Sequence, residues 1–336
     1  VAQADVVLDC SDNFATRQAL NAACVHHRVP LVSGAAIRFD GQLAVYDSRL
    51  AHSPCYACVF APDQPPPEVQ CATMGVLAPL VARARGAKIF PWLDPHDAQA
   101  QQVLQKSPPA VDPLLQDRAS VLNVLWRTRL IKQIGDAFFK QHPDAVGINL
   151  GAGLSDYFQW LDNGHNHWLD VDLEPVVRMR HVLLSPHSET AQNGHIDLSQ
   201  PGWWQRLPPS VREANAPVLL VCEGVLMHLA PTQVKAVLQE IGDNAHEGSQ
   251  LVCDFMTPLG IGQARLAPSV SGTGAQFLWG ARNGLEVARQ HPRLELLAQH
   301  TVAEAYGPVC CWAEMCLSPW TGGPLYGLAH LQITEP

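Results

Sequence analysis

Residues 145–154 read AVGINLGAGL, a short apolar run that ends in two glycines separated by one residue. Apolar runs of this length are typical of strands that are buried in parallel sheets. Gly151 and Gly153 lack a Cβ atom, so the backbone can turn at both positions and lie against a ligand. The stretch therefore predicts a strand that leads into a ligand-binding loop.

The alternation of strand and helix continues around this loop. Further strands are predicted at residues 167–172, 217–224 and 250–255, and helices at residues 120–143, 175–184 and 231–245. Strands that alternate with helices form doubly wound parallel sheets, whose ligands lie at the carboxyl ends of the strands. We therefore expect an α/β fold with a Rossmann-like sheet.

An acidic residue ends the strand that follows the glycine loop. Asp172 lies 19 residues after Gly153, where a carboxylate can accept hydrogen bonds from both hydroxyl groups of a ribose. The alternative is a structural role, in which the glycines only shape a tight turn while Asp170 and Asp172 cap the following helix.

The residue at position 156 indicates which nucleoside the loop binds. A dinucleotide-binding loop has Gly or Ala three residues after its second glycine, because helix and strand pack closely beneath the pyrophosphate. Position 156 is Asp, whose charge repels a pyrophosphate but is compatible with a sulfonium cation. The loop therefore favours S-adenosylmethionine over a dinucleotide.

Two later strands are also followed by acidic residues. In the sequence HIDL, at residues 195–198, Asp197 is placed to accept a hydrogen bond from an adenine amino group. Glu223 ends the strand predicted at 217–224. The alternative for Glu223 is to cap the segment that follows.

Six motifs between residues 120 and 333 point to one enzyme family. In order along the chain they are WRTRLI, NLGAGL, YFQWLDNG, WLDVDL, CEGVLMHLAP and CDFMTP. In these motifs the segment resembles the leucine carboxyl methyltransferase and polyketide O-methyltransferase family of class I S-adenosylmethionine-dependent enzymes. The resemblance implies a cofactor site with Arg127 at the methionine carboxylate, Gly151 and Gly153 under the methionyl part, Asp172 at the ribose, Asp197 and Leu198 around the adenine, and Glu223 near the methionine amino group.

Two positions depart from the pattern of that family. The family usually has Asp directly after the leucine of the glycine loop, where this chain has Ser155 followed by Asp156. Family members often carry Tyr after the methionine of the fourth-strand motif, where this chain has His228. The second departure leaves the wall of the acceptor site open to interpretation.

His228 is the candidate catalytic residue for an acceptor that must lose a proton. Methyl transfer is an in-line displacement at an activated carbon, so the protein mainly positions donor and acceptor. A carboxylate acceptor needs no base, whereas a phenol or alcohol needs one, and an imidazole can supply it. The alternative is that His228 is a half-buried packing residue. Trp203 and Trp204 are expected to pack in the core or a lid rather than to clamp a substrate.

The methyl acceptor is expected to be a small molecule. The sequences LGAGL and EGVLM are closer to the polyketide branch of the family than to the branch that methylates a protein C-terminus. A hydroxyl or carboxyl oxygen of a small, polyketide-like molecule is therefore the favoured acceptor.

The first part of the chain carries a second set of motifs. Between residues 4 and 81 these are DCSDNFATR, VPLVSGAAIRFDGQL, PCYAC and CATMGVLAPL. The segment resembles the adenylyltransferases that activate sulfur-carrier proteins for molybdopterin and thiamine synthesis, which are relatives of the ubiquitin-activating enzymes. The resemblance implies that Asp12 serves Mg-ATP and the adenylation step, with Asn13 and Arg17 in the same motif, and that Cys71 is a mobile thiol near the C-terminus of the carrier.

Several features of that second family are missing here. The glycine-rich nucleotide loop and the arginines that precede this segment in the family are absent, so we do not expect Mg-ATP binding or adenylation by this chain alone. The family binds structural zinc through two C-x-x-C motifs, whereas this chain has one, Cys55 and Cys58, with Cys71 as a candidate third ligand. Because structural zinc takes four ligands, zinc is the less favoured interpretation. Apart from the resemblance, Asp12 is a candidate helix N-cap and Cys71 an ordinary thiol.

The two resemblances divide the chain at residue 81. Residues 1–81 are interpreted as a partial α/β segment like that of the ubiquitin-activating enzymes, and residues 82–336 as a Rossmann-like methyltransferase domain. The chain starts with Val directly before an apolar run, so we expect the sequence to be incomplete at its N-terminus, or fused. The front segment is alternatively a non-catalytic module that binds a sulfur-carrier protein or a dimer partner, since a half-sheet with an open edge tends to pair.

Composition excludes several other classes of protein. The 336 residues include 22 Lys and Arg against 31 Asp and Glu, which leaves no broad basic surface for nucleic acid. Apolar residues make up 47% and charged residues 16%, so the chain is neither disordered nor a coiled coil. No apolar run approaches the roughly 18 to 20 residues of a membrane span, and no secretory signal opens the sequence. These features predict a cytoplasmic protein whose ten cysteines are reduced.

Overall fold

The computed structural model describes residues 1–11, 14–37, 40–50, 52–61, 75–106, 115–184, 189–213, 215–264 and 275–335. The chain forms two compact units, Val1–Val69 and Gln70–Pro336. This division differs from the boundary predicted at residue 81. Helix α4 (Leu77–Arg85) runs across that position, and its Leu80 and Val81 are buried in a core of the second unit.

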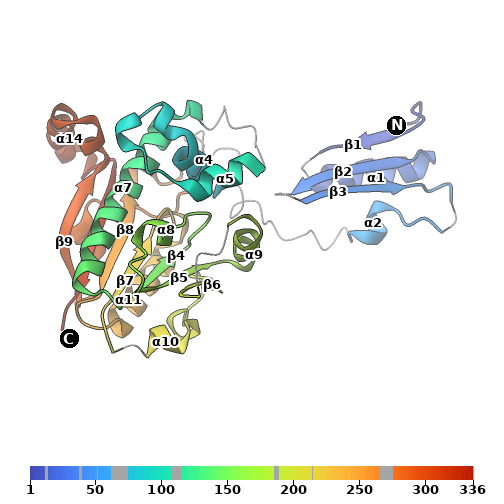
Figure 1. Cartoon of the computed structure of the whole chain (residues 1–336). Coiled ribbons are helices and arrows are strands. Elements are labelled where there is room, and N and C mark those ends of the chain that lie inside the picture. Colours follow the sequence, from blue (N-terminus) through green and yellow to red (C-terminus); the bar gives the residue numbers. More distant parts are fainter. Residues whose placement is uncertain are drawn as a thin grey trace. The chain divides into compact units, whose positions relative to one another are not determined.

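The first unit is a small α/β segment, as predicted (Figure 1). Its elements are β1 (Val7–Asp9), α1 (Phe14–His27), β2 (Leu31–Ile37), β3 (Asp40–Tyr46) and α2 (Tyr56–Val59). In the strand order β1-β2-β3, β1 runs parallel to β2, and β2 runs antiparallel to β3. Its small core consists of Cys24, Leu31, Tyr46 and Tyr56.

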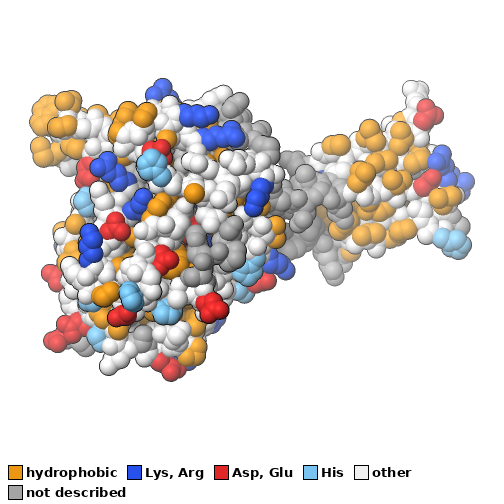
Figure 2. All heavy atoms as spheres, viewed as in Figure 1, with side chains coloured by type: hydrophobic (Ala, Val, Ile, Leu, Met, Phe, Trp, Pro, Cys, Tyr) orange, Lys and Arg blue, Asp and Glu red, His pale blue; other side chains and the backbone are white. Residues whose placement is uncertain are grey.

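Among the described residues of the first unit, the two faces of the sheet differ in burial. Leu31 and Tyr46 are buried, whereas Leu8, Leu43 and Val45 are 70%, 77% and 62% exposed. Successive side chains of a strand point to opposite faces, which explains this contrast between neighbours. Figure 2 shows the hydrophobic side chains that gather on the surface of this unit.

The second unit is built around a seven-stranded sheet with the order β6-β5-β4-β7-β8-β10-β9. Its strands are β4 (Val146–Leu150), β5 (His167–Asp172), β6 (Ala191–His195), β7 (Val218–Cys222), β8 (Gln250–Met256), β9 (Leu294–Thr301) and β10 (Tyr326–Ile333). The strands from β6 to β8 are parallel, and β10 is antiparallel to both of its neighbours. The doubly wound sheet predicted from the sequence is confirmed.

Helices cover both faces of this sheet (Figure 1). Besides α4 they are α5 (Ala98–Lys106), α7 (Arg118–Gln141), α8 (Phe158–Leu161), α9 (Glu174–Leu183), α10 (Pro209–Arg212), α11 (Pro231–Asn244), α13 (Gly284–Ala288) and α14 (Pro308–Thr321). Short 3-10 helices are η1 (Gly86–Lys88), η2 (Pro91–Leu93), η3 (Trp204–Arg206), η4 (Leu226–His228), η5 (Pro258–Gly260) and η7 (Val302–Tyr306).

Alternate residues of β7 face two different cores. Leu220 belongs to the core that contains Val237 of α11, and Leu219 belongs to the core that contains Phe138 of α7. A sheet that is buried on both faces favours apolar side chains on both, which is why β7 is a continuous apolar run.

Strands β9 and β10 follow a different pattern. Burial alternates along the first residues of β9, which exposes Leu297 at one end of the sheet. β10 lies between β8 and β9, and His330 and Gln332 interrupt its apolar residues. Neither strand is a continuous apolar run, so the sequence pattern did not predict them.

Local signals explain where two helices begin. Asp117 caps α7, because its Oδ1 accepts a hydrogen bond from the N–H of Ser120 at 3.1 Å. Pro231 occupies the first turn of α11, as predicted.

None of the helices within the described ranges combines the length and the apolar character needed to cross a membrane.

Candidate active site

The glycine loop leaves β4 at the carboxyl edge of the sheet. Gly151 and Gly153 have φ angles of 69° and 54°, in the left-handed region that favours glycine. A Cβ atom on Gly151 would lie 2.3 Å from Cγ2 of Val225, so a larger residue does not fit. The N–H groups of Gly151 and Ala152 donate to the carbonyl oxygen of Val171 at 2.8 Å and 3.0 Å. The loop is therefore held beside the end of β5.

Asp172, the last residue of β5, supports this loop directly. Its Oδ2 accepts a hydrogen bond from the N–H of Gly153 at 2.8 Å, and its Oδ1 accepts one from the N–H of Leu173 at 2.7 Å. Burial raises the pKa of the Asp172 carboxyl group, and the two backbone hydrogen bonds partly oppose this rise. Because each carboxylate oxygen can accept more than one hydrogen bond, Asp172 retains capacity for a ligand hydroxyl.

The alternative in which Asp170 and Asp172 cap α9 is not what the structure shows. Leu173 occupies the N-cap position, and no side chain caps the helix there. Asp170 instead accepts hydrogen bonds from Nη2 of Arg180 at 2.5 Å and from Nδ2 of Asn149 at 2.9 Å. Burial raises the pKa of Asp170, although Arg180 opposes it.

Arg180 of α9 is a site residue that the sequence did not single out. It is 3% exposed, and its Nη1 donates to the carbonyl oxygens of Gly153 at 3.0 Å and Ser155 at 2.6 Å. The guanidinium therefore fixes the glycine loop from the side of α9. A signal was present, since Arg180 falls four residues after Val176 and three before Leu183, on the apolar stripe of the helix.

Arg127 of α7 lies in a buried network of charges at the ends of β7 and β8. Its Nε donates to Oε1 of Glu223 at 2.5 Å, and its Nη1 donates to Oδ2 of Asp254 at 3.2 Å. The hydroxyl of Tyr326 accepts from Nη1 at 2.6 Å and donates to Asp254. The hydroxyl of Tyr157 donates to Oε2 of Glu223 at 2.6 Å. The sequence singled out Arg127 and Glu223 but missed the other three.

The charges in this network determine which groups stay ionised. Burial raises the pKa of Glu223, but Arg127 and Arg83 outweigh burial and hold it below its ordinary value. Burial raises the pKa of Asp254 above its ordinary value, against the effects of Arg127 and Tyr326. Glu223 is therefore the carboxylate that remains charged most readily. Its alternative role as a cap is not observed, since no side chain caps η4.

The nitrogens of the Arg127 guanidinium differ in their contacts. In the part of the chain that the structure describes, Nε and Nη1 are hydrogen bonded, whereas Nη2 makes no hydrogen bond. Gly224, with φ of 70°, lies beside it, because a Cβ atom there would be 3.5 Å from Nη2. The N–H of Gly224 donates to both carboxylate oxygens of Asp254, at 2.8 Å and 3.0 Å. Among the described residues, Nη2 of Arg127 is the one atom within 4 Å of a Cβ added at Gly224, so the absence of a side chain at Gly224 leaves space beside this nitrogen.

Asp197 and Leu198 follow β6 at the same edge of the sheet. The N–H of Ile196 donates to the carbonyl oxygen of Asp172 at 2.9 Å, which places this turn next to Asp172. Oδ1 of Asp197 accepts from the N–H and the hydroxyl of Ser199 at 2.9 Å and 2.6 Å, and Leu198 packs into the core. Contact of these two residues with an adenine stays a prediction.

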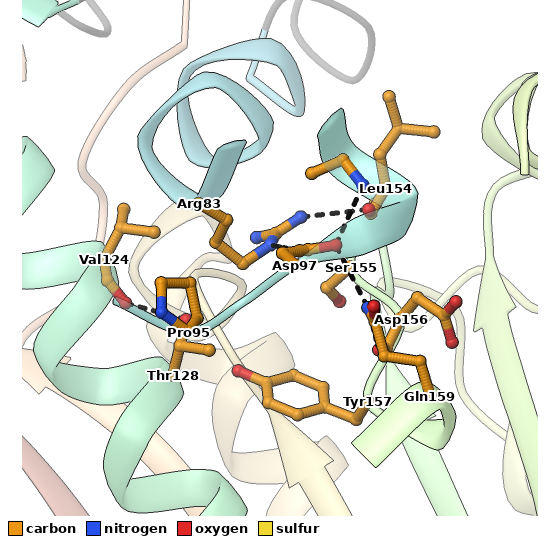
Figure 3. Close-up of polar contacts among 12 residues, drawn as sticks. Arg83, Pro95, Asp97, Val124, Thr128, Leu154, Ser155, Asp156, Tyr157 and Gln159 are labelled. Carbon is orange, nitrogen blue, oxygen red and sulfur yellow. Dashed lines mark hydrogen bonds and ion pairs between the residues drawn. The ribbon is translucent and has the colours of Figure 1, made fainter. Parts of the chain in front are cut away.

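Helices that precede α7 in the sequence contact the glycine loop (Figure 3). Nε of Arg83, in α4, donates to Oδ2 of Asp97 at 2.9 Å, and Nη2 of Arg83 donates to the carbonyl oxygen of Leu154 at 2.9 Å. Oδ1 of Asp97 accepts from Nε2 of Gln159 at 3.0 Å. This buried ion pair, which the sequence did not predict, joins α4 to the loop and to α8.

His228 is half-buried at the end of η4. Its Nδ1 lies 2.9 Å from the carbonyl oxygen of Gln276, and its ring centroid lies 5.5 Å from that of Phe277. Because a carbonyl only accepts, Nδ1 carries the proton and Nε2 the lone pair of the neutral ring. Burial lowers the pKa of His228, and the contact with Gln276 partly opposes this. The ring both packs and presents a neutral base.

Trp203 and Trp204 pack in the core, in agreement with the prediction. They are 0% and 2% exposed and belong to the core cluster that contains Leu226. Neither side chain is free to clamp a substrate.

In the first unit, several predicted site residues lie outside the described residues: Asp12, Asn13 and Cys71. Arg17 is described, and its Nε donates to the carbonyl oxygen of Ser11 at 2.9 Å while Nη2 reaches that of Gly34 at 3.3 Å. The Sγ atoms of Cys55 and Cys58 are 3.4 Å apart. Within the described ranges, no three His, Cys, Asp or Glu side chains gather as metal ligands.

The first unit is similar to sulfur-carrier adenylyltransferases. Residues 1–107 match the ThiF family model. The chain is 59% identical over 75 residues to the adenylyltransferase and sulfurtransferase MOCS3 of Drosophila willistoni, an alignment that covers 22% of this chain and 16% of that protein. It is 51% identical over 81 residues to the sulfur carrier protein ThiS adenylyltransferase of Escherichia coli, which covers 24% of this chain and 32% of that protein. The chain therefore spans less than a third of the length of these relatives.

Two solved structures resemble the fold more distantly. A putative methyltransferase from Thermobifida fusca matches with 18% sequence identity and a TM-score of 0.47, over 77% of this chain and 95% of that chain. An O-methyltransferase family protein from Burkholderia thailandensis matches with 13% identity and a TM-score of 0.41, over 76% of this chain and 64% of that chain.

The second unit matches a family model of its own. The model of leucine carboxyl methyltransferases matches residues 75–242, which is half of the chain. These residues include α4, α7, the glycine loop, Asp172 and Glu223. The chain therefore belongs to the leucine carboxyl methyltransferase family.

Proposed function

We propose that this protein is an S-adenosylmethionine-dependent O-methyltransferase that acts on a hydroxyl or carboxyl oxygen of a small molecule. The observation that supports this most directly is the meeting of Arg127, Glu223 and Asp172 around the glycine loop. S-Adenosylmethionine carries a carboxylate, an ammonium group and a ribose, and these residues offer a complementary group for each.

Each residue has a separate task in binding this cofactor. Nη2 of Arg127 is the cation that would pair with the carboxylate. Glu223, kept ionised by Arg127 and Arg83, would accept from the ammonium group. Asp172, already bonded to Gly153, would accept from the ribose hydroxyls. The bound cofactor supplies an activated methyl carbon, and the protein aligns the acceptor with it.

His228 is proposed as the general base for an acceptor that carries a proton. With Nδ1 bonded to the carbonyl oxygen of Gln276, Nε2 has the lone pair that could take the proton of a phenol or alcohol. The lowered pKa keeps the ring neutral, and so able to accept a proton, at neutral pH. A carboxylate acceptor would not need this step.

Calorimetry with S-adenosylmethionine and with its demethylated product tests the proposal. We expect micromolar affinity, on the order of −8 kcal/mol, and no comparable heat with Mg-ATP. Asp172→Ala should weaken binding of both compounds, because a hydrogen bond to a charged group contributes roughly 1.5 to 3 kcal/mol.

A matched control separates this effect from general loop damage. Asp162 is exposed, and its Oδ1 accepts from the N–H of Gly164 at 2.8 Å, so Asp162→Ala removes a similar contact elsewhere. The Asp162→Ala variant should bind S-adenosylmethionine as tightly as the unaltered protein does. Unchanged affinity in Asp172→Ala would contradict the role of Asp172, and no binding by the unaltered protein would overturn the proposed function.

For the first unit, the alternative function is adenylation of a sulfur-carrier protein. Residues 1–107 match the ThiF family model, which supports this alternative, and Arg17 donates to the carbonyl oxygens of Ser11 and Gly34. Pyrophosphate exchange with ATP that the unaltered protein shows and Asp12→Asn loses would support adenylation. No exchange by the unaltered protein would count against it.

A further inference from the structure

Cys55 and Cys58 form a close thiol pair on the first unit. Their Sγ atoms are 3.4 Å apart, whereas a disulfide bond is about 2.05 Å long. The N–H of Cys58 donates to the carbonyl oxygen of Cys55 at 3.0 Å, so one turn of backbone brings both side chains to the same side. A movement of about 1.4 Å would bring the two sulfurs to bonding distance.

Buried residues hold this turn in place. Asn21 is 4% exposed; its Nδ2 donates to Sγ of Cys55 at 3.7 Å, and its Oδ1 accepts from the N–H of Tyr56 at 2.9 Å. Tyr56, between the cysteines, is 4% exposed and packs edge-on against Tyr46 with ring centroids 5.8 Å apart. Cys58 itself is exposed and Cys55 partly exposed. The support is rigid, and the thiols are accessible.

The donors around this pair do not fit the structural zinc that the resemblance to the sulfur-carrier adenylyltransferases implies. Structural zinc takes four ligands in a tetrahedron. Cys55 and Cys58 supply two, and no further metal-binding side chain joins them among the residues with described positions. The pair is therefore free to react as a dithiol.

We propose that Cys55 and Cys58 are a thiol–disulfide exchange site that reacts with a low-molecular-weight disulfide, RSSR. One cysteine thiolate attacks a sulfur of RSSR, forms a mixed disulfide and releases RS⁻, which takes up a proton. The second thiolate attacks the protein sulfur of that mixed disulfide, closes the bond between Cys55 and Cys58 and releases a second RSH. The cysteines lose two electrons and two protons, and RSSR gains them.

The second step is intramolecular, and this gives the pair its distinctive behaviour. Two thiols held near contact react as if at a very high local concentration. A single exposed thiol such as Cys10 can only stop at the mixed disulfide. The proposal does not depend on the methyltransferase function of the second unit.

The test uses the full-length protein in oxidised glutathione without oxygen. Samples are quenched with acid, alkylated and digested, and fragmentation spectra assign the state of each cysteine. We expect Cys55 and Cys58 to lose alkylation together and to appear as one linked pair without accumulation of a mixed disulfide, whereas Cys10 stays as a mixed disulfide with glutathione. Dithiothreitol should restore both thiols.

Variants show whether the two thiols act together. Cys58→Ser and Cys55→Ser should each stop at a mixed disulfide with glutathione on the remaining cysteine. Cys10→Ser, which removes an exposed thiol elsewhere in the same unit, should leave the linked pair unchanged. Circular dichroism on every variant confirms that it is folded before the comparison is made.

Three results would overturn the proposal. The first is alkylation of Cys55 and Cys58 that glutathione does not change. The second is a disulfide that joins either residue to Cys71. The third is one zinc ion per chain, measured by elemental mass spectrometry after dialysis, that protects both thiols in the unaltered protein but is lost in Cys55→Ser.

Discussion

Arg127 and Glu223 form a buried ion pair, with 2.5 Å between Nε and Oε1, although they lie 96 positions apart in the sequence. Their side chains are 9% and 6% exposed. Two charges removed from water are stable only when each has a partner and its remaining hydrogen-bonding groups are satisfied. Tyr157 satisfies the second oxygen of Glu223, and Nη2 of Arg127 makes no hydrogen bond to a residue whose position is described.

Glu223→Gln should weaken binding of S-adenosylmethionine by about 10- to 100-fold, because the ammonium group loses a charged acceptor worth roughly 1.5 to 3 kcal/mol. Glutamine keeps the shape of the side chain and still accepts from Arg127, so the protein should remain folded. Calorimetry measures the affinity. Glu213, whose side chain is 69% exposed, provides the control: Glu213→Gln should bind S-adenosylmethionine as the unaltered protein does. Equal affinity for S-adenosylmethionine in the two variants would show that Glu223 does not contact the cofactor.

Arg180→Ala should lower the free energy of unfolding by about 3 to 5 kcal/mol, because it leaves the carboxylate of Asp170 buried without its cation. Arg178, two positions earlier, is 68% exposed and lies 3.8 Å from Glu174, so Arg178→Ala should cost less than about 1 kcal/mol. Urea unfolding of the two variants gives the comparison. A similar loss in both would show that the ion pair between Arg180 and Asp170 does not stabilise the fold.

Gly151→Ala should be more harmful than Gly164→Ala, although both glycines have a left-handed backbone. At Gly164 an added Cβ meets nothing within 4 Å, so only the backbone conformation is penalised, by about 1 to 2 kcal/mol. At Gly151 the Cβ also collides with Val225. Urea unfolding should show the difference, and adding Val225→Ala to Gly151→Ala should recover part of the stability. No recovery would mean that the collision is not the cause.

His228→Gln should lower turnover of a phenol or alcohol acceptor by roughly 100-fold or more and leave cofactor affinity nearly unchanged. Burial lowers the pKa of His228, so the base should stay unprotonated, and the rate sustained, to a lower pH than an ordinary histidine would allow. The rate should fall only at more acidic pH, and this fall should disappear in the variant.

A second histidine provides the control for this experiment. His246 is exposed, and its Nδ1 also lies against a backbone carbonyl, that of Glu247, at 2.6 Å. His246→Gln should leave turnover unchanged. If the acceptor is instead a carboxylic acid, His228→Gln should change only how well the substrate fits the site.

A screen of acceptors tests the proposed substrate class. Methylation of a protein C-terminus alone, with no small molecule methylated, would contradict the small-molecule acceptor.

His330 in β10 should make the folded state sensitive to acid. Burial, with His300 nearby, lowers the pKa of His330 to about 4, whereas an unfolded histidine has a pKa near 6.5. Between these values the unfolded chain binds more protons, so stability is complete above about pH 6.5 and is lost as the pH falls towards 4.

His330→Gln should remove this pH dependence. Glutamine cannot titrate, so the free energy of unfolding of the unaltered protein should fall relative to the variant by on the order of 1 to 2 kcal/mol between pH 7 and pH 4, allowing for partial exposure. Urea unfolding at pH 7, 5.5 and 4 measures it. If the free energy of unfolding depended on pH in the same way for both proteins, His330 would have the same pKa in the folded and the unfolded chain.

The alternation of apolar runs and helical segments was enough to predict the parallel part of the sheet. A strand that is buried on both faces is mainly apolar, so β4, β5, β7 and β8 are visible in the sequence itself. Because a parallel sheet aligns the carboxyl ends of its strands, Asp172 and Glu223 could also be expected near the glycine loop. Edge strand β9 carries no such constraint.

Only the tertiary structure decided which distant side chains meet. Arg180 contacts Asp170, Arg83 contacts Asp97 and Leu154, and Tyr326 contacts Arg127, in each case because separate elements pack together. A buried charge must find a partner, but the sequence does not say where that partner comes from. The periodicity of apolar residues in the sequence indicates on which face of a helix or strand a residue lies. Which residues that face contacts depends on how the helices and strands pack in three dimensions.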